Sequence, residues 1–221
     1  MIKDKVVIFV LMTSDDIEDM SAIDFVNSID YDNKEVVAVD MTKSMLKYLS
    51  VEEHGTQAIL APNVSDEKEK ELIVYNYLRK LFLLGDAEWL LIISDKLIFD
   101  NKHMLKTFLK NRKFVQSGIY QEDEEYTNVK VPKRAWAEPD FLFDYRQLEV
   151  KEIPPSRFRI ITSTFDICFI HRYVLSKVKF RKAEVTEPKD VFHLFCNDAR
   201  VLKWHVWCEP EARGELKNGR F

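Results

Sequence analysis

The chain has 221 residues, the ordinary size of one domain and enough to bury a hydrophobic core. Its 46% hydrophobic and 32% charged residues are typical of a globular protein and exclude extended disorder. The formal net charge of −4 gives no general attraction to nucleic acid or anionic lipid, so an anionic ligand would have to meet local cations.

No apolar stretch reaches the length of a membrane span. The opening MIKDKVVIFVLM places lysines before an apolar run, but TSDDIED follows directly without a small-residue cleavage site, which predicts a first strand and not a signal peptide. Cys168, Cys196 and Cys208 lie among apolar residues without metal-ligand spacing. We therefore expect buried, reduced thiols in a cytoplasmic protein.

Strand and helix patterns alternate through the first hundred residues. Val6 to Met12 is a continuous β-rich run, and residues 15–29 carry apolar side chains at helical spacing. The other elements predicted in this half are a strand at 35–40, a short helix at 41–49, a strand at 58–61, a helix between Ser65 and Gly85, and a strand at 88–93. This alternation predicts an α/β fold with a parallel sheet and helices on both faces.

The second half is less regular. Strands are predicted at FVQSGIY (114–120), at the start of FDICFIHRYVL (165–175) and at VWCEP (206–210). Pro188 stands where a helix with an apolar stripe begins. Residues 131–158 mix prolines, aromatics and charges with no clean period, so no regular element is predicted there.

Polar side chains follow three predicted strands at their carboxyl ends, where open α/β sheets bind their ligands. Thr13 and Ser14 follow the first strand, where they can also cap the next helix. Asp40 ends the second strand; a turn or cap role and a hydrogen bond to the base or ribose of a nucleotide are both open.

The third polar group is Ser94-Asp95-Lys96, after the strand at 88–93. A plain turn there would normally use Gly, Asn or Pro, and none is present. Asp95 can supply a carboxylate to a divalent cation that also binds a diphosphate, and Lys96 can offset diphosphate charge as a point cation.

Asp190 belongs to the first turn of the helix that Pro188 begins. It can simply complement the helix dipole, but the same positive potential keeps a carboxylate ionised, as a general base requires. Asn76, inside the long helix, either faces solvent or makes a contact. Trp136 and Tyr145 lie in an aromatic stretch that suits either ordinary packing or the binding of a sugar-like acceptor.

Taken in order, these pieces resemble a glycosyltransferase of the GT-A fold, closest to the large family-2 group. EVVAVDMTKS resembles the second strand, whose final aspartate contacts the nucleobase, a role implied for Asp40. YNYLRKLFLLGDAEWLLIISDKLIF resembles the helix with an arginine-asparagine pair and the strand that runs into the Asp-X-Asp motif. Asn76 matches the asparagine, and Tyr75 replaces the arginine. EPKDVFHLFCNDARVLKWHVWCEP resembles the segment whose Glu-Asp pair opens a helix, which places the catalytic base at Asp190.

The resemblance implies one Rossmann-like domain over residues 1–221, with a mostly parallel sheet and a small second antiparallel sheet. Residues 1–100 would bind a UDP- or GDP-sugar, and residues 101–221 would bind a hydroxyl acceptor on a glycan, protein or lipid and carry the base. Trp136 and Tyr145 would bind the acceptor, and Asp95 would hold Mn²⁺ or Mg²⁺. The nucleotide-sugar would contact Thr13, Ser14, Asp40, Asn76, Ser94, Asp95 and Lys96.

The chain departs from the family pattern at two motifs. Ser-Asp-Lys stands in place of Asp-X-Asp, and Lys189 replaces the glutamate of the Glu-Asp pair. The first departure leaves open a catalytically inactive relative that binds a nucleotide, a sugar or a partner protein. A nucleotidyltransferase on a similar sheet is a further alternative; the absence of a Gly-rich phosphate loop near the first strand counts against it.

Overall fold

The computed structural model describes residues 4–42, 44–64, 66–133 and 145–217. Its main sheet has nine strands in the order β3-β2-β1-β4-β10-β6-β11-β5, with β9 paired to β11, and a separate two-stranded sheet joins β7 to β8. The strands are β1 (Val6–Met12), β2 (Lys34–Asp40), β3 (Gln57–Leu60), β4 (Trp89–Ser94), β5 (Leu97–Phe99), β6 (Val115–Tyr120), β7 (Tyr126–Pro132), β8 (Tyr145–Glu149), β9 (Phe158–Ile160), β10 (Ile167–His171) and β11 (Val206–Leu216).

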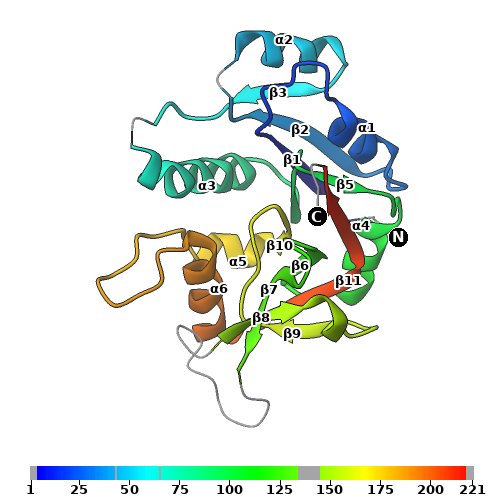
Figure 1. The fold of residues 1–221 in the computed structure, drawn as a ribbon. Helices are drawn as coiled ribbons and strands as arrows, with labels where there is room; N and C mark the ends of the chain where they lie inside the picture. Colours follow the sequence, from blue (N-terminus) through cyan, green and yellow to red (C-terminus); the bar gives the residue numbers. More distant parts are fainter. Residues whose placement is uncertain (1–3, 43, 65, 134–144, 218–221) are drawn as a thin grey trace.

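The helices cover both faces of the main sheet (Figure 1). They are α1 (Ser21–Ser28), α2 (Met45–Glu53), α3 (Glu67–Leu84), α4 (Met104–Asn111), α5 (Arg172–Lys177) and α6 (Val191–Val201), with a 3-10 turn η1 (Val150–Glu152). The predicted α/β class, with a large central sheet between helices and a small second antiparallel sheet, is confirmed. No helix in the described ranges is long and apolar enough to cross a membrane.

The direction of the strands changes in the middle of the sheet. β1 pairs in parallel with β2 and β4, and β2 pairs in parallel with β3. β10 is antiparallel to both β4 and β6, while β11 is parallel to β6 and antiparallel to β5. Strands β1 to β4 therefore form the parallel part of the sheet that the sequence predicts. The second half of the chain adds strands of mixed direction to the same sheet.

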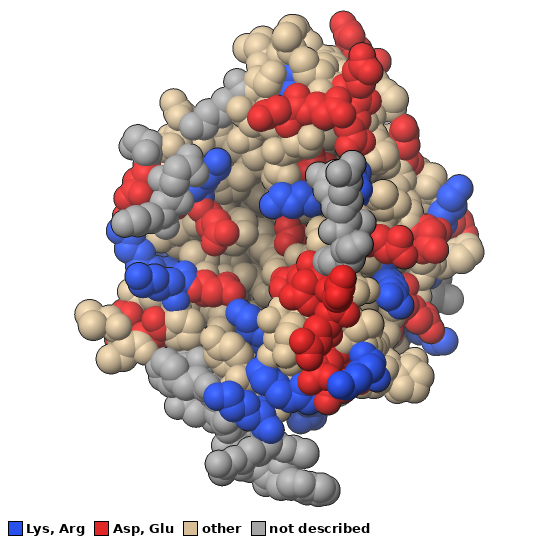
Figure 2. All heavy atoms as spheres, viewed as in Figure 1, with Lys and Arg blue, Asp and Glu red and all other residues tan. Residues whose placement is uncertain are grey.

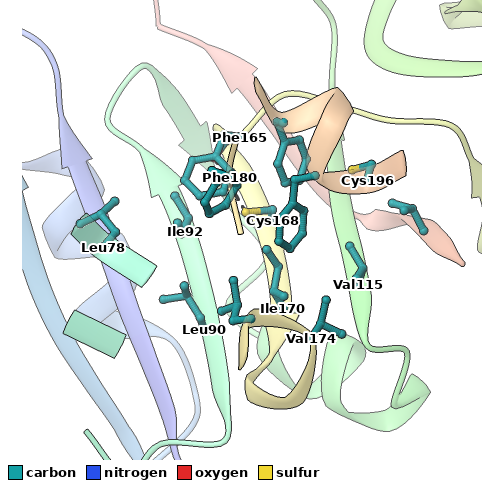
Figure 3. Packing of buried hydrophobic residues seen from close by; sticks show 14 of the residues in the cluster. Leu78, Leu90, Ile92, Val115, Phe165, Cys168, Ile170, Val174, Phe180 and Cys196 are labelled. Atoms are coloured by element: carbon teal, nitrogen blue, oxygen red, sulfur yellow. Dashed lines mark hydrogen bonds between the residues drawn. The ribbon is translucent and has the colours of Figure 1, made fainter. Parts of the chain in front are cut away.

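Strands β1 and β4 are buried on both faces, and their alternate side chains enter two different cores. In β1, Val7 and Phe9 pack on the side of α3, α5 and α6, whereas Ile8 and Val10 pack on the side of α1, α2 and α4. Figure 3 shows the first core, where Ile92 of β4 and Cys168 of β10 lie near Phe165 and Phe180.

All three cysteines are free and buried, as the sequence predicts.

Several elements were not predicted. Helix α4 and strand β5 follow the Ser94-Asp95-Lys96 turn, and β8 and β9 lie within residues 131–158, where no period is visible. The predicted final strand at 206–210 extends to Leu216, because its far end pairs with the short strand β5. Helix α2 begins after Ser44, whose side chain accepts a hydrogen bond from the backbone of Lys47, and not at residue 41.

Candidate functional site

Polar side chains lie together at the carboxyl ends of the parallel strands. Because β1 and β4 run side by side in the same direction, Thr13 and Asp95 leave the sheet at one edge. Strand β10 runs the opposite way, so the residue that precedes it, Asp166, reaches this same edge. The backbone N–H of Ser94 donates to the carbonyl oxygen of Asp166 at 2.8 Å, which ties the two segments together.

Asp95 is buried, with 1% of its surface exposed, and both of its carboxylate oxygens are already used. Oδ2 accepts hydrogen bonds from the backbone N–H groups of Thr13 (2.9 Å) and Ser14 (3.0 Å). Oδ1 accepts one from the hydroxyl of Thr13 at 2.6 Å. Asp95, the predicted metal ligand, thus fixes the loop after β1, since charge-assisted bonds of this kind are strong.

The neighbours of Asp95 point in opposite directions. Ser94 is fully buried, and its hydroxyl accepts a hydrogen bond from the backbone N–H of Lys96 at 3.3 Å. The side chain of Lys96 is exposed, and its carbonyl oxygen accepts a bond from the backbone of Lys217 at 2.9 Å. The turn is therefore held by the Ser94 hydroxyl and by the end of β11, and its exposed side chain is that of Lys96.

A cavity of about 590 Å³ opens at this edge between α3 and the start of α6. Figure 2 shows the face that carries it, with a central hollow bordered by acidic and basic side chains. Lys96 and Asp190, from opposite halves of the chain, both line this cavity. The other lining residues are Leu11, Thr13, Met41, Lys70, Glu71, Tyr75, Thr164, Phe165, Asp166 and Phe192.

Asp190 is the N-cap of α6 and lies just before its first turn, not inside it as the sequence suggested. Its Oδ1 accepts a hydrogen bond from the backbone N–H of His193 at 2.9 Å. Its Oδ2 lies 3.4 Å from the ammonium of Lys130, and 39% of the side chain remains exposed. Oδ1 is thus bonded to the first turn of the helix, and Oδ2 is paired with Lys130.

Two further acids line the cavity and were not singled out from the sequence. Asp166 accepts a hydrogen bond from the hydroxyl of Tyr120 at 2.9 Å. Partial burial, and then the negative charges of Asp190 and Asp166, raise the pKa of Glu71. Asp166 stands at the beginning of a strand, so a search at the ends of strands misses it; only the reversed direction of β10 brings it here.

Asp40 ends β2 beside Met41, which lines the cavity. It is 2% exposed, and its Oδ1 accepts bonds from the backbone N–H (2.8 Å) and the hydroxyl (2.7 Å) of Thr42. Its Oδ2 is buried without a hydrogen-bond partner among the described residues. A buried acceptor without a donor is costly, but Asp40 itself does not line the cavity.

Other predicted contact residues lie elsewhere. The amide of Asn76 donates to the carbonyl oxygens of Leu72 (3.0 Å) and Phe180 (2.8 Å), so it joins α3 to the segment after α5 and does not face the cavity. Tyr145 packs edge-on against His193, with ring centroids 4.9 Å apart, on the next turn from Asp190. Trp136 lies outside the described residues.

A second cavity, of about 550 Å³, shares Thr13 and Lys96 with the first. Its other side is formed by the loop after β1 and by the end of β11, where Lys217 forms an ion pair with Asp19. Burial alone would raise the pKa of Asp19, but hydrogen bonds from Lys217 and Ser21 lower it to about 2. The loop that carries Thr13 and Ser14 is therefore fixed from three directions: Asp95, Lys217 and the buried Lys47, which donates to the carbonyl of Asp19 at 3.1 Å.

The donor set does not fit a divalent cation. Within the described ranges no group of three or more His, Cys, Asp or Glu side chains is placed to hold a metal ion. A Mg²⁺ or Mn²⁺ bound through a diphosphate would still need one or two protein carboxylates, and the loop already fills three of the roughly four acceptor positions of the Asp95 carboxylate.

No protein-family model and no curated protein matches the sequence. Solved structures match the fold. A mannosyltransferase from Pyrobaculum calidifontis, in complex with GDP-mannose and Mn²⁺, aligns with a TM-score of 0.64 at 12% identity over 99% of this chain and 59% of the other. This chain therefore spans about three fifths of that enzyme's length.

Two shorter structures also align. A197 from STIV gives a TM-score of 0.52 at 13% identity over 95% of this chain and 84% of that one. The CMP:2-keto-3-deoxy-manno-octonic acid synthetase complexed with CTP gives 0.53 at 11% identity over 94% and 90%. At these identities the likeness concerns the fold alone.

Proposed function

We propose that the protein is an inverting glycosyltransferase that moves a sugar from a nucleoside-diphosphate sugar to an acceptor hydroxyl. The observation that carries the proposal is the meeting of Asp190 and Lys96 in one cavity at the carboxyl edge of the parallel strands. This edge is where open α/β sheets bind nucleotides. The fold neighbours with GDP-mannose and CTP support a nucleotide ligand of either purine or pyrimidine type.

Different residues would contact the nucleoside and the diphosphate of such a donor. Met41, which lines the cavity beside the end of β2, would contact the base or the ribose. The backbone of Thr13 and the ammonium of Lys96 would contact the diphosphate. The acceptor would enter beside Asp190 and Tyr145, in the second half of the chain.

In the reaction, Oδ2 of Asp190 takes the proton of the acceptor hydroxyl while that oxygen forms a bond to the anomeric carbon. The bond from this carbon to the diphosphate oxygen breaks on the opposite face, and its electron pair leaves with the nucleoside diphosphate. Proton transfer to a positioned base contributes about 10²- to 10⁴-fold in rate. Cations near the leaving diphosphate stabilise the charge that develops there.

The direct test is Asp190→Asn in a transfer or donor-hydrolysis assay with UDP- and GDP-sugars. Asparagine is also a good N-cap, so the start of α6 should be preserved. We expect turnover to fall by at least about 100-fold while the Kd for the nucleotide changes by less than about threefold. Asp100→Asn, a change at an exposed acid outside the cavity, is the matched control. Unchanged turnover in Asp190→Asn would remove this residue from the mechanism.

A nucleotidyltransferase is the second candidate, because the CTP-bound synthetase aligns over most of both chains. It would release pyrophosphate from a nucleoside triphosphate, whereas the proposed transferase would release a nucleoside diphosphate. Incubation with each triphosphate and a set of sugars, with pyrophosphate as the readout, separates the two. Nucleotide binding without either product would favour a binding protein that has lost catalysis.

A further inference from the structure

The turn at Ser94–Lys96 lacks a carboxylate at both acidic positions of the Asp-X-Asp motif that it resembles. Ser94 is buried with its hydroxyl bonded to the turn, and Lys96 carries a positive charge. Asp95, at the middle position, is committed to Thr13 and Ser14. A cation held between this turn and a diphosphate would meet an ammonium group where it needs an oxygen ligand.

Lysine side chains gather where the phosphates would lie. Lys96 and Lys70 line the cavity from two different elements, the turn after β4 and helix α3. Lys130 reaches the same region from β7 and lies 3.4 Å from Asp190. Lys96 is the best placed of the three, because its backbone is fixed by hydrogen bonds with Ser94 and Lys217 on either side.

Two ammonium groups carry the same total charge as one divalent cation. A nucleoside diphosphate carries about two to three negative charges at neutral pH, so it needs compensation when it enters a partly enclosed cavity. Lysine binds phosphate as a point charge without any fixed coordination geometry. The acids Glu71 and Asp166 in the same cavity increase the need for such cations, since they repel the ligand.

We propose that Lys96, together with Lys70, neutralises the donor diphosphate in place of a divalent cation, so that this site binds its nucleotide and releases it without a metal. The inference rests on the proposed function. When the bond between the anomeric carbon and the diphosphate oxygen breaks, the electron pair remains on that oxygen, and the ammonium of Lys96 stabilises the added charge.

The first experiment is isothermal calorimetry of the full chain with UDP and GDP, in EDTA and then in Mn²⁺ or Mg²⁺. We expect at least one nucleotide to bind in EDTA, with a Kd within about threefold of its value with either metal. Binding that requires a metal would overturn this inference and leave the proposed function intact. Absence of binding under every condition would contradict the proposed function itself, and the inference with it.

The second experiment separates the charge of Lys96 from its packing. Lys96→Met should weaken UDP or GDP binding at least tenfold while uridine or guanosine, which lack phosphates, bind as before. Lys96→Arg should restore most of the lost affinity. Lys102→Met, at an exposed lysine outside the cavity, is the matched control and should change nothing. Equal binding of the diphosphate by Lys96→Met and the unmodified protein would overturn the assignment.

The third experiment reverses the charge. Lys96→Asp returns a carboxylate to the second acidic position of the motif, on an exposed side chain that should not disturb the core. We expect this variant to bind the diphosphate poorly in EDTA and at least fivefold more tightly with Mn²⁺. A variant that remains insensitive to Mn²⁺ while Lys96→Met binds normally would show that position 96 does not face the diphosphate.

Discussion

Substitution of Asp95 by asparagine tests whether the main role of this acid is to fix the loop after β1 or to bind a metal ion. The carboxylate accepts three hydrogen bonds, two from the backbone of Thr13 and Ser14 and one from the Thr13 hydroxyl. A bond to a charged acceptor contributes about 1.5–3 kcal/mol, and a neutral one about 0.5–1.5 kcal/mol, so Asp95→Asn loses about 1 kcal/mol per bond. The expected loss in the free energy of unfolding is about 3 kcal/mol.

Urea unfolding at neutral pH in EDTA measures this loss directly, and thermal unfolding checks it. For a chain of this length about 3 kcal/mol corresponds to a decrease in Tm of roughly 6–12 °C. Asp40→Asn is the matched control, because one oxygen of Asp40 has no partner among the described residues and the other can remain as the asparagine carbonyl. By the same arithmetic, the two bonds that Asp40 accepts from Thr42 pass to a neutral acceptor, so this variant should lose about 2 kcal/mol, less than Asp95→Asn.

The sign of the result decides between the two roles of Asp95. An acid that waits for a metal is an uncompensated buried charge, so its replacement by a neutral amide in the absence of metal should stabilise the protein. An increase in Tm for Asp95→Asn in EDTA would therefore refute the hydrogen-bonded loop as the main role of this side chain.

Two further predictions concern the frame around the site. Because the folded-state pKa of Asp19 is lowered to about 2, its ion pair with Lys217 should stabilise the protein above about pH 4 and be lost as the pH falls toward 2. Acid unfolding of Lys217→Met should show a smaller loss of stability in this window than the unmodified protein; equal curves would contradict the pairing. Gly118→Ala would place a methyl group 2.2 Å from Ile167 and 2.4 Å from the carbonyl of Ala212, so we expect a loss of about 3 kcal/mol in urea unfolding. Normal stability would show that β6 and β10 can separate at this point.

The parallel half of the fold follows from its sequence because each element there has a strong local signal. Continuous apolar runs such as Val6 to Met12 predict strands buried on both faces, and the intervening segments carry helical periods. Strand β9 has three residues and β5 has three, too few to establish a period. Their conformation depends on pairing with β11, which no local pattern shows.

Strand-end reasoning predicted Thr13 and Lys96, which line the cavity, because it needs only the direction of parallel strands. It also predicted Asp40, which does not line the cavity. It did not find Asp166, which depends on β10 running antiparallel to β4. It also gave no indication that the Asp95 side chain turns inward, because that direction is set by donors 81 and 82 positions earlier in the chain.

The two oxygens of Asp190 have separate tasks, and this division constrains how the site can change. Oδ1 holds the first turn of α6 through His193, and this bond orients Oδ2 before any ligand arrives. Any substitution at residue 190 acts on the start of α6 and on the cavity wall at the same time, because the same carboxylate caps the helix and lines the cavity. Variants made to reshape the cavity should therefore keep residue 190 and its helix together as one unit, and vary the surrounding walls.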